Sequence, residues 1–390
     1  MEKRHFFVIG GGSLQADLIL LAKKEFIVHL FDYNEDCFCR DLADIFHLIS
    51  IDKKEEILKL AKEYNIIGIA TCATELGNLS TCFVGEHLNL GTNSYECALN
   101  TTDKLRMKKI FAKHDIKSAE YIILKEEKDL EKIKSFPVVI KPSDRSAGRG
   151  VVKIYDKKDL KNAFENALSF SFNKIVLAEK ELKGKQVSIE CISSNKKHQV
   201  LAITREYFRR GEFEDDFLET MHLMPARLDK DDENLIKDFA IKILNAFEIC
   251  YGASHIEIKF DPDTKEISVI EIASRMGGLR DFLMQNSLNI NYLQLLLDAT
   301  LKKPLKPISI KPSCTCLDYF IYTKKDYEFY KALKQYKPEL FIKEHILANE
   351  NTKFSYPSSL TDSHGYYYIK LDLDQDIKPF IEQNLQAIKI

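Results

Sequence analysis

Short apolar runs alternate with amphipathic segments along the first hundred residues of the chain. The runs, which predict buried strands, span residues 6–9, 26–31 and 66–70. Apolar residues recur at helical spacing between Ile57 and Tyr64 and predict one face of a helix over 55–64, and residues 14–24 have a helical pattern as well. Strands that alternate with helices are typical of a doubly wound parallel sheet, so we expect a Rossmann-like domain over residues 1–100.

The pattern changes after residue 100. A charged, mostly helical segment is predicted over 103–134, and a long amphipathic helix over 235–247. Further strands are predicted at 175–178, 187–192, 199–204, 253–260 and 266–272. The chain is therefore expected to be an α/β protein, in which the N-terminal parallel-sheet domain precedes an α+β fold of two subdomains and a small C-terminal α+β module.

Composition and charge exclude several classes of protein. With 390 residues and a net charge of −2, the chain has no general attraction for nucleic acid or acidic membranes. No apolar run approaches the roughly 20 residues that span a bilayer, and residues 1–5 lead into a strand rather than a signal peptide. Nine cysteines, an odd number without the usual C-x₂-C zinc spacing, predict reduced and mostly buried thiols in a cytoplasmic protein.

The segment from Phe136 to Val151 carries the strongest chemical signal. Its first apolar run predicts a strand that ends in a lysine, and a turn rich in Ser, Gly and Arg follows. Glycines remove side chains, so backbone N–H groups can close around an anion. The residues of interest are Lys141, Ser143, Ser146, Gly148, Arg149 and Gly150. The hairpin suits a polyphosphate; the alternative is an ordinary turn with solvated cations.

Glu257 and Glu271 form a candidate metal-binding pair. If the hairpin between their strands folds about Thr264, the two glutamates face each other directly; a turn centred one residue earlier leaves them diagonal on the same face. Facing carboxylates repel by about 3–4 kcal/mol at an effective dielectric of about 20. A bound Mg²⁺ turns that repulsion into attraction, because it prefers oxygen ligands. The alternative is an exposed sheet face decorated with charges.

The glycines at 10–12 give a weak signal for a dinucleotide site. They follow a strand, and Asp32 lies about where a dinucleotide-binding fold has its ribose acid. However, Gln15 stands where the third glycine of that motif is expected, which disfavours an NAD oxidoreductase.

Two further segments are ambiguous when taken alone. Arg275, Gly277 and Gly278 suit a loop that receives a transferring phosphoryl group, but the same residues also fit a capped turn. Residues 177–190 form a polar linker between strands, which can present backbone groups to a purine or simply connect the strands.

Together and in this order, these segments resemble the ATP-grasp superfamily, and within it the carboxylate–amine ligases related to L-amino-acid (dipeptide) ligases and to carbamoyl phosphate synthase large-subunit domains. The similarity covers about residues 5–300. Residues 102–108, Thr-Asp-Lys-Leu-Arg-Met-Lys, are similar to the family's T-D-K-x-x-M-K start, and residues 138–143 to its V-x-K-P strand. The resemblance implies nucleotide contacts at Lys104, Lys141, Ser146, Gly148, Arg149, Gly150, Glu179, Leu182 and Gln186. It also implies that Glu257 and Glu271 bind metal and that Arg275 stabilises an acyl-phosphate step.

The resemblance also implies a division into domains, and two positions depart from the family pattern. The expected units are a pre-ATP-grasp domain (1–100), a nucleotide lid (101–185), a metal and phosphate subdomain (186–305) and the C-terminal module (306–390). Gln186 stands where a ribose-binding Glu is usual. Ala273 stands where an Asn often supplies a third metal ligand, and this E-x-A-x-R form resembles the dipeptide-ligase branch.

A loop over residues 205–225 is expected to close over the acceptor substrate. It carries Arg205, Arg209, Arg210 and His222, which supply positive charge for a carboxylate, and Gly277 and Gly278 are candidates for the same site. The alternative is a solvated surface loop.

The resemblance implies an ATP-dependent, ADP-forming ligase that activates a small-molecule carboxylate as an acyl phosphate and couples it to an amine. Its cofactors would be ATP and Mg²⁺, with two ions expected and Mn²⁺ as a substitute. Partners would be small molecules, without nucleic acid or membrane, and a homodimer is an expectation from the family resemblance. The alternatives are carboxylation or phosphorylation by another ATP-grasp chemistry, and a non-catalytic nucleotide-binding protein.

Overall fold

A computed structural model describes residues 3–146, 148–208, 217–355, 357 and 362–377, and its N-terminal part is a four-stranded parallel sheet. The strands are β1 (His5–Ile9), β2 (Ile27–Asp32), β3 (Ile45–Leu48) and β4 (Gly68–Ala70), in the order β3-β2-β1-β4. The helices of this part are α1 (Ala16–Ala22), α2 (Lys54–Glu63), α3 (Glu75–His87) and α4 (Tyr95–Asn100). Phe6 and Phe7, neighbours on β1, belong to separate buried clusters on the two faces. The doubly wound parallel sheet predicted from the sequence is confirmed.

The second part is a small antiparallel sheet with one helix against it. Its elements are α5 (Lys104–Lys113), β5 (Tyr121–Leu124), β6 (Val138–Pro142), β7 (Val152–Ile154), α6 (Leu160–Phe170) and β8 (Val176–Lys180), and the strand order is β5-β8-β6-β7. The expectation that residues 103–134 are mostly helical is wrong beyond α5. The apolar run at 121–124 pairs with β8 instead of continuing a helix.

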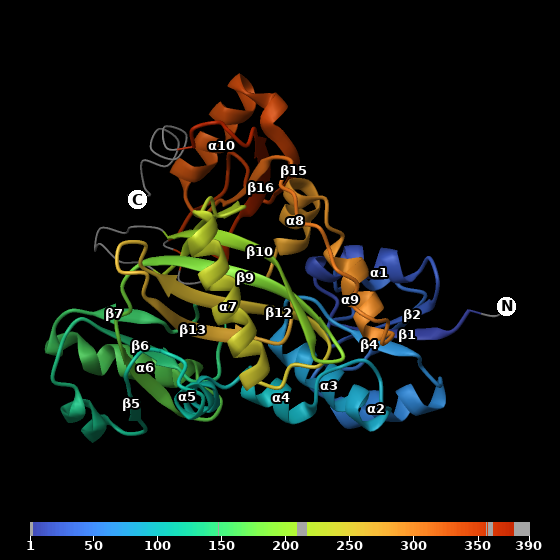
Figure 1. Cartoon of the computed structure of the whole chain (residues 1–390), viewed down its shortest axis with the longest axis horizontal. Coiled ribbons are helices and arrows are strands. Elements are labelled where there is room, and N and C mark those ends of the chain that lie inside the picture. Colours follow the sequence, from blue (N-terminus) through green and yellow to red (C-terminus); the bar gives the residue numbers. More distant parts are fainter. Residues whose placement is uncertain (1–2, 147, 209–216, 356, 358–361, 378–390) are drawn as a thin grey trace.

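The third part is an eight-stranded antiparallel sheet, ordered β13-β12-β9-β10-β11-β14-β16-β15. Its strands are β9 (Lys185–Ser194), β10 (Lys197–Phe208), β11 (Glu219–Met224), β12 (Gly252–Phe260), β13 (Ile267–Ala273), β14 (Thr315–Phe320), β15 (Phe341–Ile346) and β16 (Gly365–Leu371). The associated helices are α7 (Lys230–Ala246), α8 (Arg280–Leu288), α9 (Tyr292–Thr300) and α10 (Lys324–Tyr336). Figure 1 shows α7 lying across one face of this sheet, over β9, β10 and β12.

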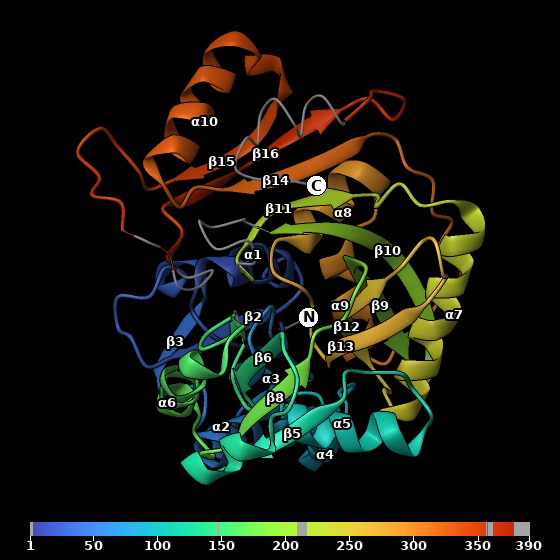
Figure 2. The same cartoon turned by 90° about the vertical axis from the view of Figure 1, so that its left-hand side faces the viewer.

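The strands of the C-terminal module continue this sheet. β14 pairs with β11, and β16 pairs with β14 and β15, so one sheet runs through both the β12–β13 hairpin and the module. Figure 2 shows the module above the other parts, with α10 on its outer face. Five short 3₁₀ helices complete the described elements: Ser13–Gln15, Arg40–Leu42, Glu127–Lys132, Lys157–Asp159 and Pro338–Leu340.

A β-bulge sets the register that matters for function. Phe260 pairs with Ile267 and Ile258 with Val269, but the register then shifts, so that Glu257 pairs with Glu271. Without the extra residue, Glu257 would lie opposite Ile270, and Glu271 would point to the other face of the sheet. The bulge therefore places the two glutamates directly opposite each other, as predicted for a turn about Thr264, although the turn itself is centred between residues 263 and 264 and matches neither predicted position.

In the described part of the chain, no helix combines the length and apolar character needed to cross a bilayer. All nine cysteines are free thiols, and seven of them are buried.

Candidate active site

A cavity of about 690 Å³ is lined by residues from all three parts of the fold. Its lining includes most of the residues proposed from the sequence: Lys104, Lys141, Ser146, Gly148, Arg149, Glu179, Leu182, Gln186, His222, Glu257, Glu271, Arg275 and Gly278. Gly150, Arg205 and Gly277 are outside this lining. Residues far apart in the sequence thus meet at one site.

Lys104, at the start of α5, lies beside one of the proposed metal ligands. Its ammonium nitrogen is 2.8 Å from Oε2 of Glu271 and also donates to the carbonyl of Arg145 at 2.8 Å. Asp103 caps the helix by accepting from the amide of Arg106, which fixes the direction of the first turn. Burial alone would raise the pKa of Glu271, but Lys104, with Lys141 and Arg275, outweighs it and lowers the pKa to about 2. Glu271 is therefore an anion at neutral pH.

Glu179 pairs with two lysines that come from different elements, β6 and α5. Its carboxylate lies 2.9 Å from the ammonium of Lys141 and 3.1 Å from that of Lys108. All three side chains are buried. Burial would raise the pKa of Glu179, but the two ammonium groups outweigh it and lower the pKa. The resemblance implied that Glu179 contacts the nucleotide; in the structure its carboxylate pairs with Lys108 and Lys141.

The hairpin after Lys141 has the backbone that its glycines predict. Gly148 and Gly150 have φ of +70° and +74°, in the left-handed region that favours glycine. A Cβ at Gly148 would meet no other atom within 4 Å, so this part of the loop faces open space. Arg149 folds back on the loop, with Nε donating to the carbonyl of Ser146 at 3.1 Å. This geometry suits a loop that closes on an anion.

Glu257 is crowded by other acids. Gln186 donates to it at 3.2 Å and to Glu206 at 2.9 Å, and His255 Nε2 is 3.2 Å from its Oε1. Burial, followed by the charges of Glu206 and Glu271, raises the pKa of Glu257 to about 7. Buried carboxylates that repel one another fit a divalent cation, and the ligand atoms of Glu206, His255 and Glu257 all lie within 4.8 Å of one another. His255 is held by an acid at each ring nitrogen, so the oxygen donors Glu257 and Glu206 are the ones in this group that suit Mg²⁺, and sequence reasoning missed Glu206 as a ligand candidate.

Arg275 follows β13 and is held by the N-terminal domain. Its Nε donates to Oε1 of Glu75 at 2.9 Å, and its Nη1 donates to the carbonyl of Met276 at 2.9 Å. Glu75 is the first residue of α3, where the helix end favours a negative charge. The ion pair fixes the guanidinium at the cavity wall.

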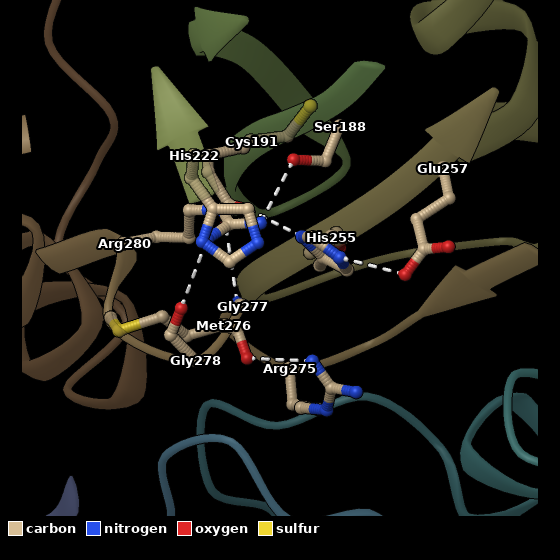
Figure 3. A network of polar contacts seen from close by, with 12 residues as sticks. Ser188, Cys191, His222, His255, Glu257, Arg275, Met276, Gly277, Gly278 and Arg280 are labelled. Carbon is tan, nitrogen blue, oxygen red and sulfur yellow. Dashed lines mark hydrogen bonds and ion pairs between the residues drawn. The ribbon is translucent and has the colours of Figure 1, made fainter. Parts of the chain in front are cut away.

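Glu190, fully buried on β9, is the centre of the contacts beneath the 275–280 loop. It pairs with Nδ1 of His255, accepts from the amide of Gly277 at 3.2 Å, and lies 3.8 Å from Nε of Arg280. Arg280 in turn donates to Glu206 at 2.9 Å and to the carbonyl of Gly278 at 3.3 Å. Figure 3 shows His255 between this loop and Glu257. The network links the loop to the β12–β13 hairpin, which carries Glu257 and Glu271.

Several proposed residues are engaged differently from what was expected. His222 was assigned positive charge for a carboxylate substrate, but its ring lies between Asp318 (2.8 Å) and Glu219 (2.9 Å), which already neutralise that charge. Arg205 donates to the carbonyl of Gln186 and stacks on Tyr207. Gln186, expected at the ribose, donates its amide hydrogens to two carboxylates. Arg209 and Arg210 lie outside the described residues.

The glycine turn at 10–12 uses Asp32 for its own structure. The amide of Gly11 donates to the carboxylate of Asp32 at 2.7 Å. Gln15 donates to the carbonyl of Cys72 and accepts from its amide. The Rossmann-like spacing therefore has a structural role within this sheet.

Sequence reasoning missed Glu75, Lys108, Glu190, Glu206, His255 and Arg280. One signal was available: Gln186, Ser188 and Glu190 alternate along β9 and pair with Lys259, Glu257 and His255 of β12. Polar residues at alternate positions of a central strand lie on one face, and a buried polar face indicates a site. Glu75 and Arg280 had no such pattern, because tertiary packing alone brings them to the cavity.

Comparison with known proteins agrees with this geometry. Residues 134–281 match the ATP-grasp domain family. The D-alanine–D-alanine ligase of Clostridium acetobutylicum is 26% identical over 190 residues, covering 45% of this chain and 54% of that protein. The D-alanine–D-alanine ligase of Thermosipho africanus is 30% identical over 165 residues, covering 40% and 43%. The chain thus spans about half the length of these relatives.

Solved structures share the fold over the whole chain. An L-amino acid ligase from Bacillus licheniformis has a TM-score of 0.79 at 20% identity, covering 100% of this chain and 98% of that one. N5-carboxyaminoimidazole synthetase from Staphylococcus aureus, complexed with ADP, has a TM-score of 0.77 at 22% identity, covering 99% and 97%. The resemblance that the sequence motifs carried is confirmed.

Proposed function

We propose that this chain, whose residues 134–281 match the ATP-grasp domain family, is an ADP-forming ligase that joins a small-molecule carboxylate to an amine. The observation that carries the proposal is the direct pairing of Glu257 with Glu271 at the wall of a cavity that also presents Lys104, Lys141 and Arg275. Two carboxylates for metal and three cations for phosphate are what phosphoryl transfer from ATP requires.

Each residue has a role in this proposal. Lys104 and Lys141 contact the phosphates, and the hairpin at Ser146, Gly148, Arg149 and Gly150 closes around them, while Leu182 flanks the base. Glu257 and Glu271 hold Mg²⁺, whose charge offsets that of the triphosphate when it is bound. Arg275, fixed by Glu75, stabilises the charge that develops on the transferring phosphoryl group. Gly277 and Gly278 shape the loop that faces the substrates.

The chemistry needs two displacements and no protein nucleophile. A carboxylate oxygen of the acid attacks the γ-phosphorus of ATP, the bond to the β-phosphate oxygen breaks, and ADP leaves with an acyl phosphate remaining. The amine then attacks the acyl carbon and loses a proton, and inorganic phosphate leaves with the oxygen that came from the acid. The chain's contribution is positioning and charge neutralisation.

Isotope transfer tests this scheme. We expect ATP, Mg²⁺ and suitable acid–amine pairs to give ADP and phosphate, and an acid labelled with ¹⁸O in its carboxylate to give phosphate with one ¹⁸O atom. AMP and pyrophosphate as products would overturn the proposal. Unlabelled phosphate, or a phosphorylated product without an amide, would indicate a different ATP-grasp reaction. Bicarbonate offered as the acid tests carboxylation in the same assay.

A further inference from the structure

Lys259, on β12, lines the cavity with an ammonium group that the structure leaves without a polar partner. Its side chain is half-buried, and its Nζ lies over the ring of Phe208, 5.3 Å from the ring centroid. Among the residues that the structure describes, none offers this ammonium group a hydrogen bond or an ion pair. An ammonium group has three donors, and leaving them unpaired in a partly buried place costs free energy. Lys259 can therefore donate to a ligand in the cavity.

The acids near Lys259 are paired with other cations. Glu181 lies 2.7 Å from the ammonium group of Lys153, and Glu206 lies 2.9 Å from the guanidinium of Arg280. The charged groups that act on Lys259 are Arg205, Glu206, Glu181 and Glu257. They include a second cation besides the three acids, so the surroundings do not neutralise Lys259 by a dedicated partner.

The register of β12 places Lys259 between the proposed metal site and the proposed base site. Lys259 pairs with Gln186 on β9, directly after the linker that carries Leu182, and Glu257 lies two residues earlier on the same face of β12. Two residues of a strand span about 7 Å, comparable to the separation of the β-phosphate and the ribose in a nucleotide. A nucleotide with its phosphates near Glu257 and its base at Leu182 therefore has its ribose beside Lys259.

Gln186 lies at the same register but has no donor left for a ribose. Its amide nitrogen donates to Glu206 at 2.9 Å and to Glu257 at 3.2 Å, which uses both amide hydrogens. Arg205 donates to the backbone carbonyl of Gln186 and is outside the cavity lining. A ribose hydroxyl both donates and accepts, so the carbonyl oxygen of Gln186 satisfies only half of its bonding capacity. Lys259 can supply the missing donor.

We propose that Lys259 recognises the ribose of the bound nucleotide by donating from its ammonium group to a ribose hydroxyl. Gln186 stands where a ribose-binding acid is usual, and in this chain a cation on the neighbouring strand takes over part of that task. The inference rests on the proposed function, because it requires a nucleotide in the cavity, and it adds a residue that determines specificity for the sugar.

Binding of MgADP and of its 2′,3′-dideoxy analogue to the full chain tests the inference. The two ligands share the base and the phosphates and differ only in the ribose hydroxyls, and neither the acid nor the amine is needed. We expect the wild-type chain to bind MgADP about tenfold more tightly in calorimetry, because hydrogen bonds to a charged group are among the stronger ones. Equal affinity for the two ligands would overturn the inference without any variant.

Lys259→Met removes the ammonium group and keeps an apolar stem. It should weaken MgADP about tenfold and the dideoxy analogue less than about twofold, so that the preference for ribose is lost. The control Lys185→Met removes an exposed lysine next to Gln186 that is outside the cavity lining, and should change neither affinity. If Lys259→Met weakens both ligands equally, Lys259 does not act on the ribose and the inference is wrong.

The inference and the ligase function fail by different results. MgADP that binds without a preference for ribose would contradict the role of Lys259 alone. Failure of ADP formation with every acid and amine, while MgADP still binds with that preference, would contradict the ligase function alone. Absence of MgADP binding would contradict both.

Discussion

The amide of Gly277 donates a hydrogen bond to the buried carboxylate of Glu190, 87 residues earlier in the chain. This contact ties the loop after β13 to the middle of the central sheet. A Cβ added at Gly277 would lie 2.6 Å from both Oε1 of Glu190 and Nδ1 of His255. Gly277 is not among the glycines with a left-handed φ, so its backbone conformation does not require glycine. Glycine is required because Glu190 and His255 leave no room for a Cβ.

Gly277→Ala should destabilise the protein, and Gly278→Ala is its matched control. At Gly277 the new methyl group displaces a buried ion pair, which should cost about 1–3 kcal/mol of unfolding free energy. At Gly278 the nearest atom to a new Cβ is Leu14 Cδ1 at 3.9 Å, so the cost should be within about 0.5 kcal/mol. Urea unfolding of both variants measures the difference. Equal losses would show that the loop is not packed as described.

Glu190→Gln should be more damaging than a change at an exposed glutamate. The variant leaves His255 and Arg280 without their shared buried anion, and breaking a buried ion pair typically costs about 3–5 kcal/mol. Glu350, which pairs with Lys331 at the surface, is the control, and Glu350→Gln should cost less than about 1 kcal/mol. Chemical denaturation gives both values, and a small loss at Glu190 would remove it from the centre of the network.

Glu271→Gln should abolish ADP formation while the fold remains. A glutamine keeps the shape of the side chain but removes the negative charge that faces Glu257 across the bulge, so turnover should fall at least about 100-fold. The control is Glu266→Gln. Glu266 is exposed, lies just before the same strand and pairs with Lys117. Phosphate release and circular dichroism are measured for both. Undiminished turnover in Glu271→Gln would contradict the metal assignment.

The sequence predicted the parallel N-terminal sheet and the carboxylate pair because both rest on local regularities. Strands that are buried on both faces appear in the sequence as continuous apolar runs. Strands of a hairpin with one buried face alternate between apolar and polar residues, so both kinds can be recognised from the sequence. The bulge between Glu257 and Ile258 was beyond such reasoning, although it decides whether Glu271 faces the cavity. The two turn positions considered from the sequence were both wrong by half a residue, and the unpredicted bulge restores the direct pairing.

Partners of the site residues were not predictable in the same way. Arg275 and Glu75 are 200 residues apart, and no period in the sequence connects them. His222 was assigned to a carboxylate substrate from its charge alone. The acid that neutralises this charge, Asp318, lies on β14, almost 100 residues later in the chain, and nothing in the sequence indicates the pairing. Charges can be counted in a sequence, but their pairing depends on tertiary structure.

A row of histidines in the N-terminal sheet has a consequence for acid stability. His5, His29 and His47 lie on adjacent strands, with His29 at 2.8 Å from His5 and 2.9 Å from His47. His29 is fully buried and stacks on His47, and Tyr64 meets its ring edge-on. Burial, and next the neighbouring His47 and His5, lower the pKa of His29 to about 4.

His29 should make the protein less stable as the pH falls from about 6.5 to 4. Because its pKa is lower in the folded state than in the unfolded state, the unfolded chain binds the proton first, and stability present above pH 6.5 is lost progressively down to pH 4. The loss should reach about 3 kcal/mol, since each pKa unit is worth about 1.4 kcal/mol. His29→Phe, which keeps an aromatic ring among Phe7, Phe31 and Tyr64, should flatten this part of the profile, whereas His114→Phe at an exposed position should not. Urea midpoints at pH 7, 5.5 and 4 measure the slope, and the same slope in wild type and His29→Phe would show that another group titrates.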